Sequence, residues 1–184
     1  LREIAGASPA ARMADVVRAL VEAREGGDRI REIVRGLRAF AREEVASRSI
    51  DLAAAIRVAH NISKHELRHR ARLELEIDPV AEVQGDEARV TQVLVNLLVN
   101  AAQAFETSDP ERNCVRLRLR MVGDRVQVEV ADNGPGMSPE VQARMFDPFF
   151  TTKPVGVGTG LGLSICHSIA ASMGAELTYE TEPG

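Results

Sequence analysis

Aromatic residues are scarce in this sequence of 184 residues: they make up 3%, with no tryptophan, one tyrosine and five phenylalanines. The core must therefore be built mainly from valine, leucine, isoleucine and alanine. There are two cysteines, Cys114 and Cys166, and their spacing fits no metal site, so we expect reduced thiols in a cytosolic protein. No apolar run approaches the roughly 18 residues of a membrane-spanning helix, and no signal peptide is visible.

Positive charge is not in excess either. The formal net charge is −4 at pH 7, so nothing indicates a basic surface for nucleic acid or membranes. With 45% hydrophobic and 27% charged residues, the composition is typical of a soluble globular protein. We predict a cytoplasmic location, no nucleic-acid partner and no membrane contact by this stretch, with any membrane anchor of the full protein outside it. Because Leu1 rather than methionine begins the sequence, we expect a piece of a longer protein.

Residues 1–46 and 51–184 differ in their pattern, and we predict that they belong to two domains. Ser8-Pro9 is a typical helix start. Over 10–46, apolar residues recur mostly at spacings of three and four, which predicts one long amphipathic helix. Its single apolar stripe needs a partner, and a second chain or upstream sequence is the simplest one.

Residues 51–184 mix helical and strand patterns, with Asp51 and Asp86 as predicted helix caps and 47–50 as a polar connection. The predicted elements are helices over 52–67, 86–105 and 161–173, a short helix from Ser138, strands over 71–77 and 175–179, and a hairpin of 115–121 with 126–131. This order predicts an α+β fold: a two-layer α/β sandwich with helices on one face of a mixed, mostly antiparallel sheet, preceded by the long α-helix.

Asn96 and Asn100 lie four residues apart and so share one face of the predicted helix. A side-chain amide oxygen is a hard, neutral ligand that suits Mg²⁺, which prefers oxygen donors and keeps water and substrate phosphates as further ligands. Two asparagines on a helix can also be ordinary polar surface, so the pair alone leaves both interpretations open.

Asp132 ends the second hairpin strand, and Gly134 and Gly136 follow it. Glycine lets a ligand approach the backbone closely. A carboxylate at this place can accept a hydrogen bond from an exocyclic amine such as that of adenine. Taken alone, a plain Asp-Asn-Gly turn is the simpler interpretation.

Glycines alternate at 156, 158, 160 and 162, where a helix is predicted to begin. Free amides at a helix amino terminus bind phosphate, and Lys153 adds positive charge just before them. A flexible linker is the alternative interpretation. The G-x-x-x-x-G-K-[ST] phosphate loop and the serine, threonine and tyrosine kinase signatures are absent, and the alternating glycines do not fit the dinucleotide fingerprint.

In this order, the three segments and the Phe-Asp-Pro-Phe-Phe-Thr-Thr-Lys run at 146–153 resemble the N, G1, F and G2 boxes of sensor histidine kinases, in the nitrogen-regulation-type branch. The catalytic domain of that family has the Bergerat ATP-binding fold, which gyrase, Hsp90 and MutL share. The resemblance covers about 51–184, and 1–46 resembles the carboxyl-terminal part of the dimerisation and phosphotransfer hairpin. It implies the catalytic core of a two-component sensor histidine kinase, which binds Mg-ATP and donates the γ-phosphate to a histidine for relay to a response regulator aspartate.

The resemblance also implies a role for each matching residue. Asn100 would hold Mg²⁺, Asp132 would recognise the adenine amine, and Lys153 would reach the phosphates from an ATP lid at 146–159. Asn96 stands where the ATPase relatives carry a glutamate that activates water. Because an amide cannot act as a general base, Asn96 implies phosphotransfer rather than hydrolysis, and it is predicted with Lys153 to be catalytic. The predicted nucleotide-binding residues are Asn96, Asn100, Gln103, Ala104, Asp132, Gly134, Gly136, Met137, Lys153, Gly158, Thr159, Gly160, Leu161 and Gly162.

None of the four histidines fits the phosphate acceptor of the family. His65-Glu66 imitates the start of the acceptor motif, but it follows the predicted hairpin helix and lacks the expected proline. His60 and His69 share the same predicted helix, and His167 is expected to be structural. The acceptor is therefore expected upstream of this sequence, so that the fragment alone binds ATP without autophosphorylation. The implied partners are a second copy, through the amino-terminal helices, and the receiver domain of a response regulator.

Two departures from the family pattern and two alternatives stay open. Gln103 stands where many relatives carry lysine or histidine, and the sequence ends where they usually add another core strand, so the sheet is expected to lack an edge strand. The alternatives are a protein serine kinase of the anti-sigma type and a nucleotide-binding or scaffolding module without transferase activity.

Overall fold

The computed structural model describes residues 13–21, 23–24, 26–27, 48–154 and 158–182. Residues 13–21 are helical, as predicted for the long amino-terminal helix. Their apolar side chains are exposed, with Met13 and Leu20 each at 65%. Most of the remaining prediction for 10–46 lies outside the described residues.

Two helices begin where the sequence supplies a capping carboxylate. In α2 (Leu52–Leu67) Asp51 Oδ1 accepts a hydrogen bond from the Ala53 N–H at 2.8 Å. In α3 (Glu87–Ala104) Asp86 Oδ1 accepts one from the Ala88 N–H at 2.9 Å. Both predicted caps are confirmed, and each satisfies backbone donors that the helix leaves unpaired. The other helices are α4 (Pro139–Gln142) and α5 (Gly162–Ser172).

The main sheet has three strands in the order β2 (Arg72–Ile77), β4 (Cys114–Val122) and β5 (Arg125–Asp132). β2 runs parallel to β4, and β4 pairs with β5 in the predicted antiparallel hairpin. A second, two-stranded antiparallel sheet joins β1 (Arg48–Ile50) to β3 (Val83–Gly85). The predicted polar connection at 47–50 is therefore wrong for Arg48–Ile50, which form a strand and bury Ile50. Neither short strand was predicted, because three residues are too few to show an alternation.

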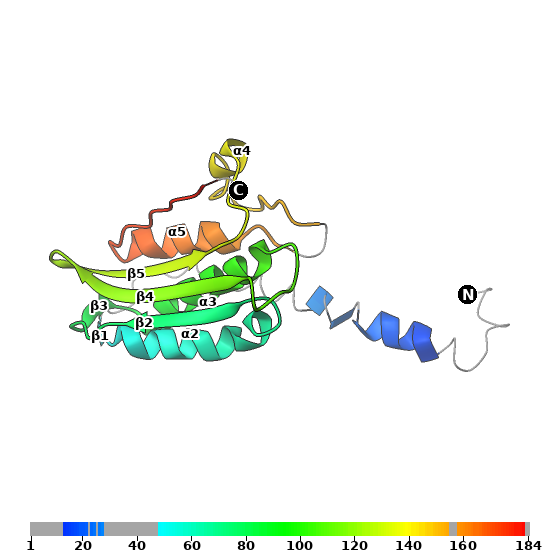
Figure 1. The fold of residues 1–184 in the computed structure, drawn as a ribbon, viewed down its shortest axis with the longest axis horizontal. Coiled ribbons are helices and arrows are strands. Elements are labelled where there is room, and N and C mark those ends of the chain that lie inside the picture. The colour runs from blue at the N-terminus through cyan, green and yellow to red at the C-terminus, as the bar shows by residue number, and fades with distance from the viewer. Residues whose placement is uncertain (1–12, 22, 25, 28–47, 155–157, 183–184) are drawn as a thin grey trace.

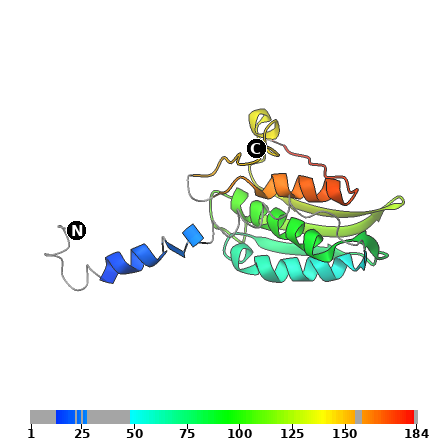
Figure 2. The same cartoon turned by 180° about the vertical axis from the view of Figure 1, so that it is seen from behind.

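Helices α2, α3 and α5 cover one face of the main sheet, as Figure 2 shows from the helix side. Val115, Leu117 and Leu119 of β4 point into the layer between sheet and helices and are at most 1% exposed. Ile56 of α2 and Leu98 of α3 meet them with no exposed surface. Burying each of these side chains contributes about 1.5–3 kcal/mol. The predicted two-layer α/β sandwich is therefore confirmed.

The outer face of the sheet carries paired charges. Arg116 of β4 bridges Glu74 at 3.0 Å, and Arg118 bridges Glu76 at 2.7 Å and Glu129 at 3.2 Å. Hydrogen bonds to Arg116 lower the pKa of Glu74, and hydrogen bonding to Glu76 raises the pKa of Arg118. Because these groups remain partly exposed to solvent, the ion pairs stabilise the fold only slightly.

The predicted strand over 175–179 is wrong, since residues 175–182 are irregular. This segment (the red trace in Figure 1) leads from the end of α5 toward α4, and its side chains contact other parts of the fold. Arg125 at the start of β5 bridges Glu176 at 3.2 Å, and Tyr179 packs edge-on against Phe146 with ring centroids 6.1 Å apart. The alternation in the sequence therefore reflects side-chain packing, without a backbone ladder in this part of the structure.

Candidate nucleotide-binding site

The residues predicted to bind nucleotide come from three parts of the fold that meet around α3. Helix α3 packs against both α5 and β5. The carboxyl-terminal half of α3, from Asn96 to Ala104, carries four of the predicted residues. Asn96, Asn100, Gln103 and Ala104 all lie on this half of the helix. The loop 146–154 and the described glycines that precede α5 complete the arrangement, which Figure 1 shows at the right of the molecule.

Asn96 connects α3 to the amino terminus of α5. Its Nδ2 donates a hydrogen bond to the Gly162 carbonyl oxygen at 3.3 Å. Next to Asn96, the fully buried thiol of Cys166 donates to the Val93 carbonyl oxygen at 3.8 Å. Burial raises the pKa of Cys166 to about 12, and the neighbouring Asn96 amide opposes that rise only in part. The thiol is therefore protonated at neutral pH and is no candidate nucleophile.

Asn100 and Gln103 hold the lysine of the loop 146–154. Lys153 Nζ donates hydrogen bonds to Gln103 Oε1 at 2.6 Å and to Asn100 Oδ1 at 3.4 Å. A Cβ added at Gly162 would lie 3.4 Å from Asn100 Nδ2, so a glycine at this place leaves room for the amide beside the first turn of α5. Two side-chain oxygens, a cation and a helix amino terminus thus lie together, which is a typical arrangement for a polyphosphate.

Asp132 forms a tight turn at the carboxyl end of β5. Its Oδ1 accepts a hydrogen bond from the Gly134 N–H at 2.9 Å. A Cβ added at Gly134 would lie 2.7 Å from the same oxygen and 3.4 Å from the Ala104 side chain. Asp132, Gly134 and Ala104 are therefore brought together, as predicted. The Asp132 side chain is exposed, so its carboxylate is accessible to a ligand.

Glycine is required by conformation at two of the predicted positions. Gly136 has a φ of 71°, and a Cβ there would overlap the carbonyl group of Glu182. Gly160 has a φ of 66°, and a Cβ there would overlap the carbonyl of Phe149. The Gly160 carbonyl also accepts a hydrogen bond from the Phe149 N–H at 2.9 Å. Both glycines therefore permit close backbone contacts that any other residue would block.

The remaining predicted residues are held differently. The Leu161 side chain is buried against Ile165 and Ile169, so Leu161 can serve a ligand only through its backbone. Met137 donates its N–H to Thr181 Oγ1 at 2.9 Å, and Thr159 is half-buried. The Gly158 position is restricted by Thr151, whose Oγ1 would lie 2.7 Å from an added Cβ.

Sequence reasoning missed several residues that hold the site in place. Asn133 fixes the Asp132 turn, because its Oδ1 accepts from the Cys114 N–H at 2.7 Å and its Nδ2 donates to the Arg112 carbonyl at 2.9 Å. Phe146 packs on His167 of α5 with ring centroids 5.2 Å apart, in line with the structural role expected for that histidine. No local pattern marks these partners, since the contacts join segments far apart in the sequence.

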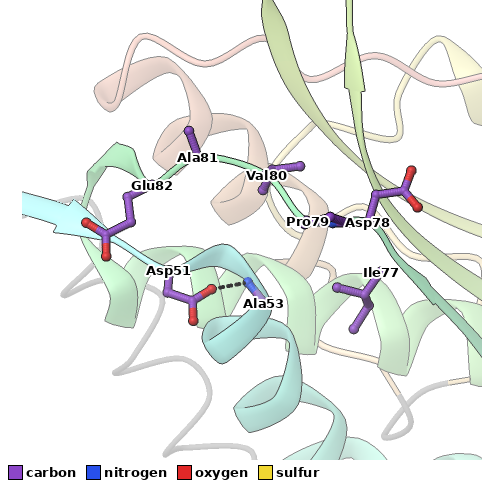
Figure 3. Close-up of a pocket in the computed structure, with 8 residues that line it drawn as sticks. All are labelled: Asp51, Ala53, Ile77, Asp78, Pro79, Val80, Ala81 and Glu82. Carbon is purple, nitrogen blue, oxygen red and sulfur yellow. Dashed lines mark hydrogen bonds between the residues drawn. The ribbon is translucent and has the colours of Figure 1, made fainter.

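A hollow lies elsewhere, between the start of α2 and the β2–β3 connection (Figure 3). It has a volume of about 470 Å³ and is lined by Asp51, Ala53, Ile77, Asp78, Pro79, Val80, Ala81 and Glu82. None of the predicted nucleotide-binding residues lies along it. The candidate site is therefore defined by its converging side chains and glycines rather than by this hollow.

The donor set fits one kind of metal ion. No group of three or more His, Cys, Asp or Glu side chains in the described part of the chain could hold a metal. The Asn100 amide oxygen would need phosphate oxygens and water as further ligands, and Mg²⁺ is commonly bound in this way.

Among the described helices, none combines the length and apolar character needed to cross a bilayer.

Comparison with known proteins agrees with this geometry. Residues 85–184, more than half of the chain, match the family model described as histidine kinase-, DNA gyrase B- and HSP90-like ATPase. The chain is 44% identical over 100 residues to the two-component sensor PprA of Pseudomonas aeruginosa, an alignment that covers 52% of this chain and 11% of PprA. It is 35% identical over 170 residues to the sensor histidine kinase ZraS of Klebsiella oxytoca, which covers 90% of this chain and 35% of ZraS.

A solved structure is similar to the chain in both fold and sequence. The crystal structure of full-length ShkA in complex with AMPPNP matches with a TM-score of 0.67 at 31% identity, over 85% of this chain and 34% of ShkA. The chain thus spans only a minor part of these three proteins. The fold, the motifs and the relatives together show that the chain belongs to the histidine kinase-, DNA gyrase B- and HSP90-like ATPase family, among the sensor histidine kinases.

Proposed function

We propose that this chain is the ATP-binding catalytic core of a two-component sensor kinase and donates the γ-phosphate of Mg-ATP to a histidine outside this sequence. The observation that carries the proposal is the meeting of Asn100, Lys153 and Gly162. An oxygen ligand, a cation and a helix amino terminus lie close together there, and this supports the proposal that one triphosphate contacts all three. That ShkA was crystallised with AMPPNP supports nucleotide binding in this fold.

The base and the phosphates are held at separate ends of the site. The exposed Asp132 carboxylate accepts a hydrogen bond from the adenine amine, and Gly134 lets the ring lie against the backbone beside Ala104. The phosphates lie along the start of α5, and Lys153 neutralises part of their charge. Mg²⁺, held through Asn100 Oδ1, would supply further charge neutralisation on the phosphate oxygens.

Transfer to a side chain rather than to water follows from the chemistry of Asn96. A nitrogen of the acceptor imidazole attacks the γ-phosphorus, a N–P bond forms, the bond to the bridging oxygen breaks, and ADP leaves with the electron pair. Hydrolysis instead needs a base that removes a proton from water. Asn96 is an amide whose Nδ2 is already used on Gly162, so it offers no base for that step.

The two parts of the chain imply two partners. The exposed apolar side chains of the helix at 13–21, including Met13, Val17 and Leu20, are suited to pairing with a second copy in a helical bundle. The phosphohistidine is then the substrate for the receiver domain of a response regulator. The nitrogen-regulation-type branch remains part of this proposal and rests on the 146–153 run alone.

The decisive experiment uses the full-length protein and ATP labelled at the γ-phosphate. We expect labelled protein whose phosphate is lost in acid and retained in base, as phosphohistidine requires. The present chain alone should bind ATP in calorimetry and remain unlabelled. Acid-stable phosphoserine would favour a serine kinase instead, and ATP binding without any transfer by the full-length protein would favour a nucleotide-binding module.

A further inference from the structure

Lys153 is hydrogen-bonded to two side chains of α3. Its ammonium group lies 2.6 Å from Gln103 Oε1 and 3.4 Å from Asn100 Oδ1, and the side chain is partly buried. The loop 146–154 is thereby attached to α3 through a charge-assisted hydrogen bond, which is stronger than a neutral one. The lysine that is proposed to contact phosphate is therefore held at a defined place on α3.

A second contact of Gln103, with Glu66 of α2, orients its amide toward Lys153. Gln103 Nε2 donates to Glu66 Oε1 of α2 at 3.4 Å, and the same carboxylate oxygen accepts from Arg70 Nε at 3.1 Å. A glutamine amide has one face that donates and one that accepts. With the carboxylate on one side and the ammonium on the other, only the orientation with its oxygen toward Lys153 satisfies both partners.

We infer that Glu66 and Gln103 are positioning residues that hold Lys153, and with it the loop 146–154, against α3, and that Lys153 leaves this position when Mg-ATP binds. The inference rests on the proposed function in one respect, namely that Lys153 moves to the phosphates. Asn100 Oδ1 is the atom proposed to hold Mg²⁺, and two cations repel each other on one oxygen. Mg-ATP binding therefore requires that Lys153 leave Asn100, so the loop reports whether the site is occupied.

Hydrogen exchange of the backbone amides in 146–154 tests the inference. In the nucleotide-free protein we expect Gln103→Leu and Glu66→Gln to speed this exchange roughly three- to tenfold, as loss of a partly exposed charged hydrogen bond implies. Glu106→Gln is the matched control, because Glu106 is an exposed carboxylate just beyond α3. It should leave exchange at the wild-type rate.

Exchanging the side chains at 66 and 103 distinguishes an effect on the orientation of the residue at 103 from a general loss of structure. In the double variant Glu66→Gln/Gln103→Glu, the new amide at 66 donates to a new carboxylate at 103, which still accepts from Lys153. We expect protection of the nucleotide-free loop to return to the wild-type level or above it. Slow exchange in Gln103→Leu, or no recovery in the swapped pair, would overturn the inference.

The nucleotide-bound state supplies the second comparison. With saturating Mg-AMPPNP, Glu66→Gln should exchange like the wild type, since Lys153 has then left Gln103. Equal acceleration in both states would show a merely structural role for Glu66 and would overturn the inference. If AMPPNP fails to bind the wild type in calorimetry, the proposed function is wrong, while the nucleotide-free comparison still decides whether Glu66 and Gln103 hold Lys153.

Discussion

Asn96 of α3 and Gly162 of α5 are joined by a hydrogen bond of 3.3 Å from a side-chain amide to a backbone carbonyl. The helix that carries the candidate metal ligand is therefore fixed to the helix whose first turn is proposed to bind the phosphates. Because Asn100 lies one turn beyond Asn96, its distance from that first turn is set by the same bond. The position of the proposed metal ligand relative to the proposed phosphate site therefore depends on the contact between α3 and α5.

Removing the Asn100 amide should make nucleotide binding insensitive to Mg²⁺. We expect Asn100→Ala to bind ATP equally in Mg²⁺ and in EDTA, whereas the wild type should lose affinity in EDTA by about tenfold, or about 1.4 kcal/mol. Calorimetry under both conditions measures the difference. Asn61→Ala, at an exposed position of α2, is the control and should behave like the wild type. A variant that keeps the wild-type response to EDTA would exclude Asn100 as the metal ligand.

Asp132→Asn should weaken ATP binding while preserving the turn. The amide oxygen can still accept from Gly134, but the charge that favours the adenine amine is lost, which corresponds to about 1.5–3 kcal/mol or roughly ten- to hundredfold in affinity. Titration with ATP gives the loss directly. Asp124→Asn in the β4–β5 turn is the matched control, because it removes an exposed carboxylate away from the site. Unchanged affinity in Asp132→Asn would remove the adenine role.

Gly160→Ala and Gly123→Ala separate backbone strain from steric overlap. Both glycines have positive φ, 66° and 61°, but an added Cβ meets nothing within 4 Å at Gly123 and overlaps the Phe149 carbonyl at Gly160. We expect Gly123→Ala to lower the free energy of unfolding by about 1 kcal/mol and Gly160→Ala to lower it by about 2 kcal/mol or more. Urea unfolding measures both. Equal losses of unfolding free energy in the two variants would show that the Phe149 backbone moves away from the added methyl group at no energetic cost.

The buried thiol of Cys166 should make stability fall in alkali. Its pKa is raised from 9.0 to about 12 by burial, so between pH 9 and 12 the unfolded chain loses a proton that the folded protein keeps. The free energy of unfolding then decreases with rising pH by up to about 1.4 kcal/mol per pH unit from this group. Below pH 9 its contribution is constant.

The alkaline effect is measured by comparison with Cys166→Ala, since other groups also titrate in that range. The difference in unfolding free energy between wild type and variant should narrow as the pH rises from 9. A thiol reagent at pH 8 should modify Cys114, which is partly exposed, well before Cys166. Parallel pH curves for the two proteins would contradict the buried-thiol interpretation.

Local patterns were sufficient for the caps, the helices and the hairpin of this fold. Asp51 and Asp86 start helices for a reason contained within three residues, and the alternation in β4 and β5 spans enough residues to be recognised. The short strands β1 and β3 give no such signal, and the 175–179 alternation comes from packing against Phe146 rather than from pairing. Pairing depends on a neighbouring strand, which local sequence does not specify.

The candidate site divides in the same way. Asn96 and Asn100 share a helix face by spacing alone, so their proximity could be predicted. The contact of Gln103 with Glu66 joins residues 37 apart, and that of Lys153 with Gln103 joins residues 50 apart. Such contacts depend on how α2, α3 and the loop 146–154 pack, and no local pattern predicts them.

The hydrogen bond from Met137 to Thr181 spans 44 residues of sequence and closes the path from the Asp132 turn through the loop 146–154 and α5 back to that turn. The segment after α5 therefore stabilises the position of the loop that contains Gly136. Proteolytic removal of the residues beyond Tyr179 would remove the Thr181 acceptor and so loosen the loop next to Asp132, at the end of the site proposed to bind adenine. We therefore expect a cut beyond Tyr179 to lower the affinity for ATP even though Asp132 itself is intact.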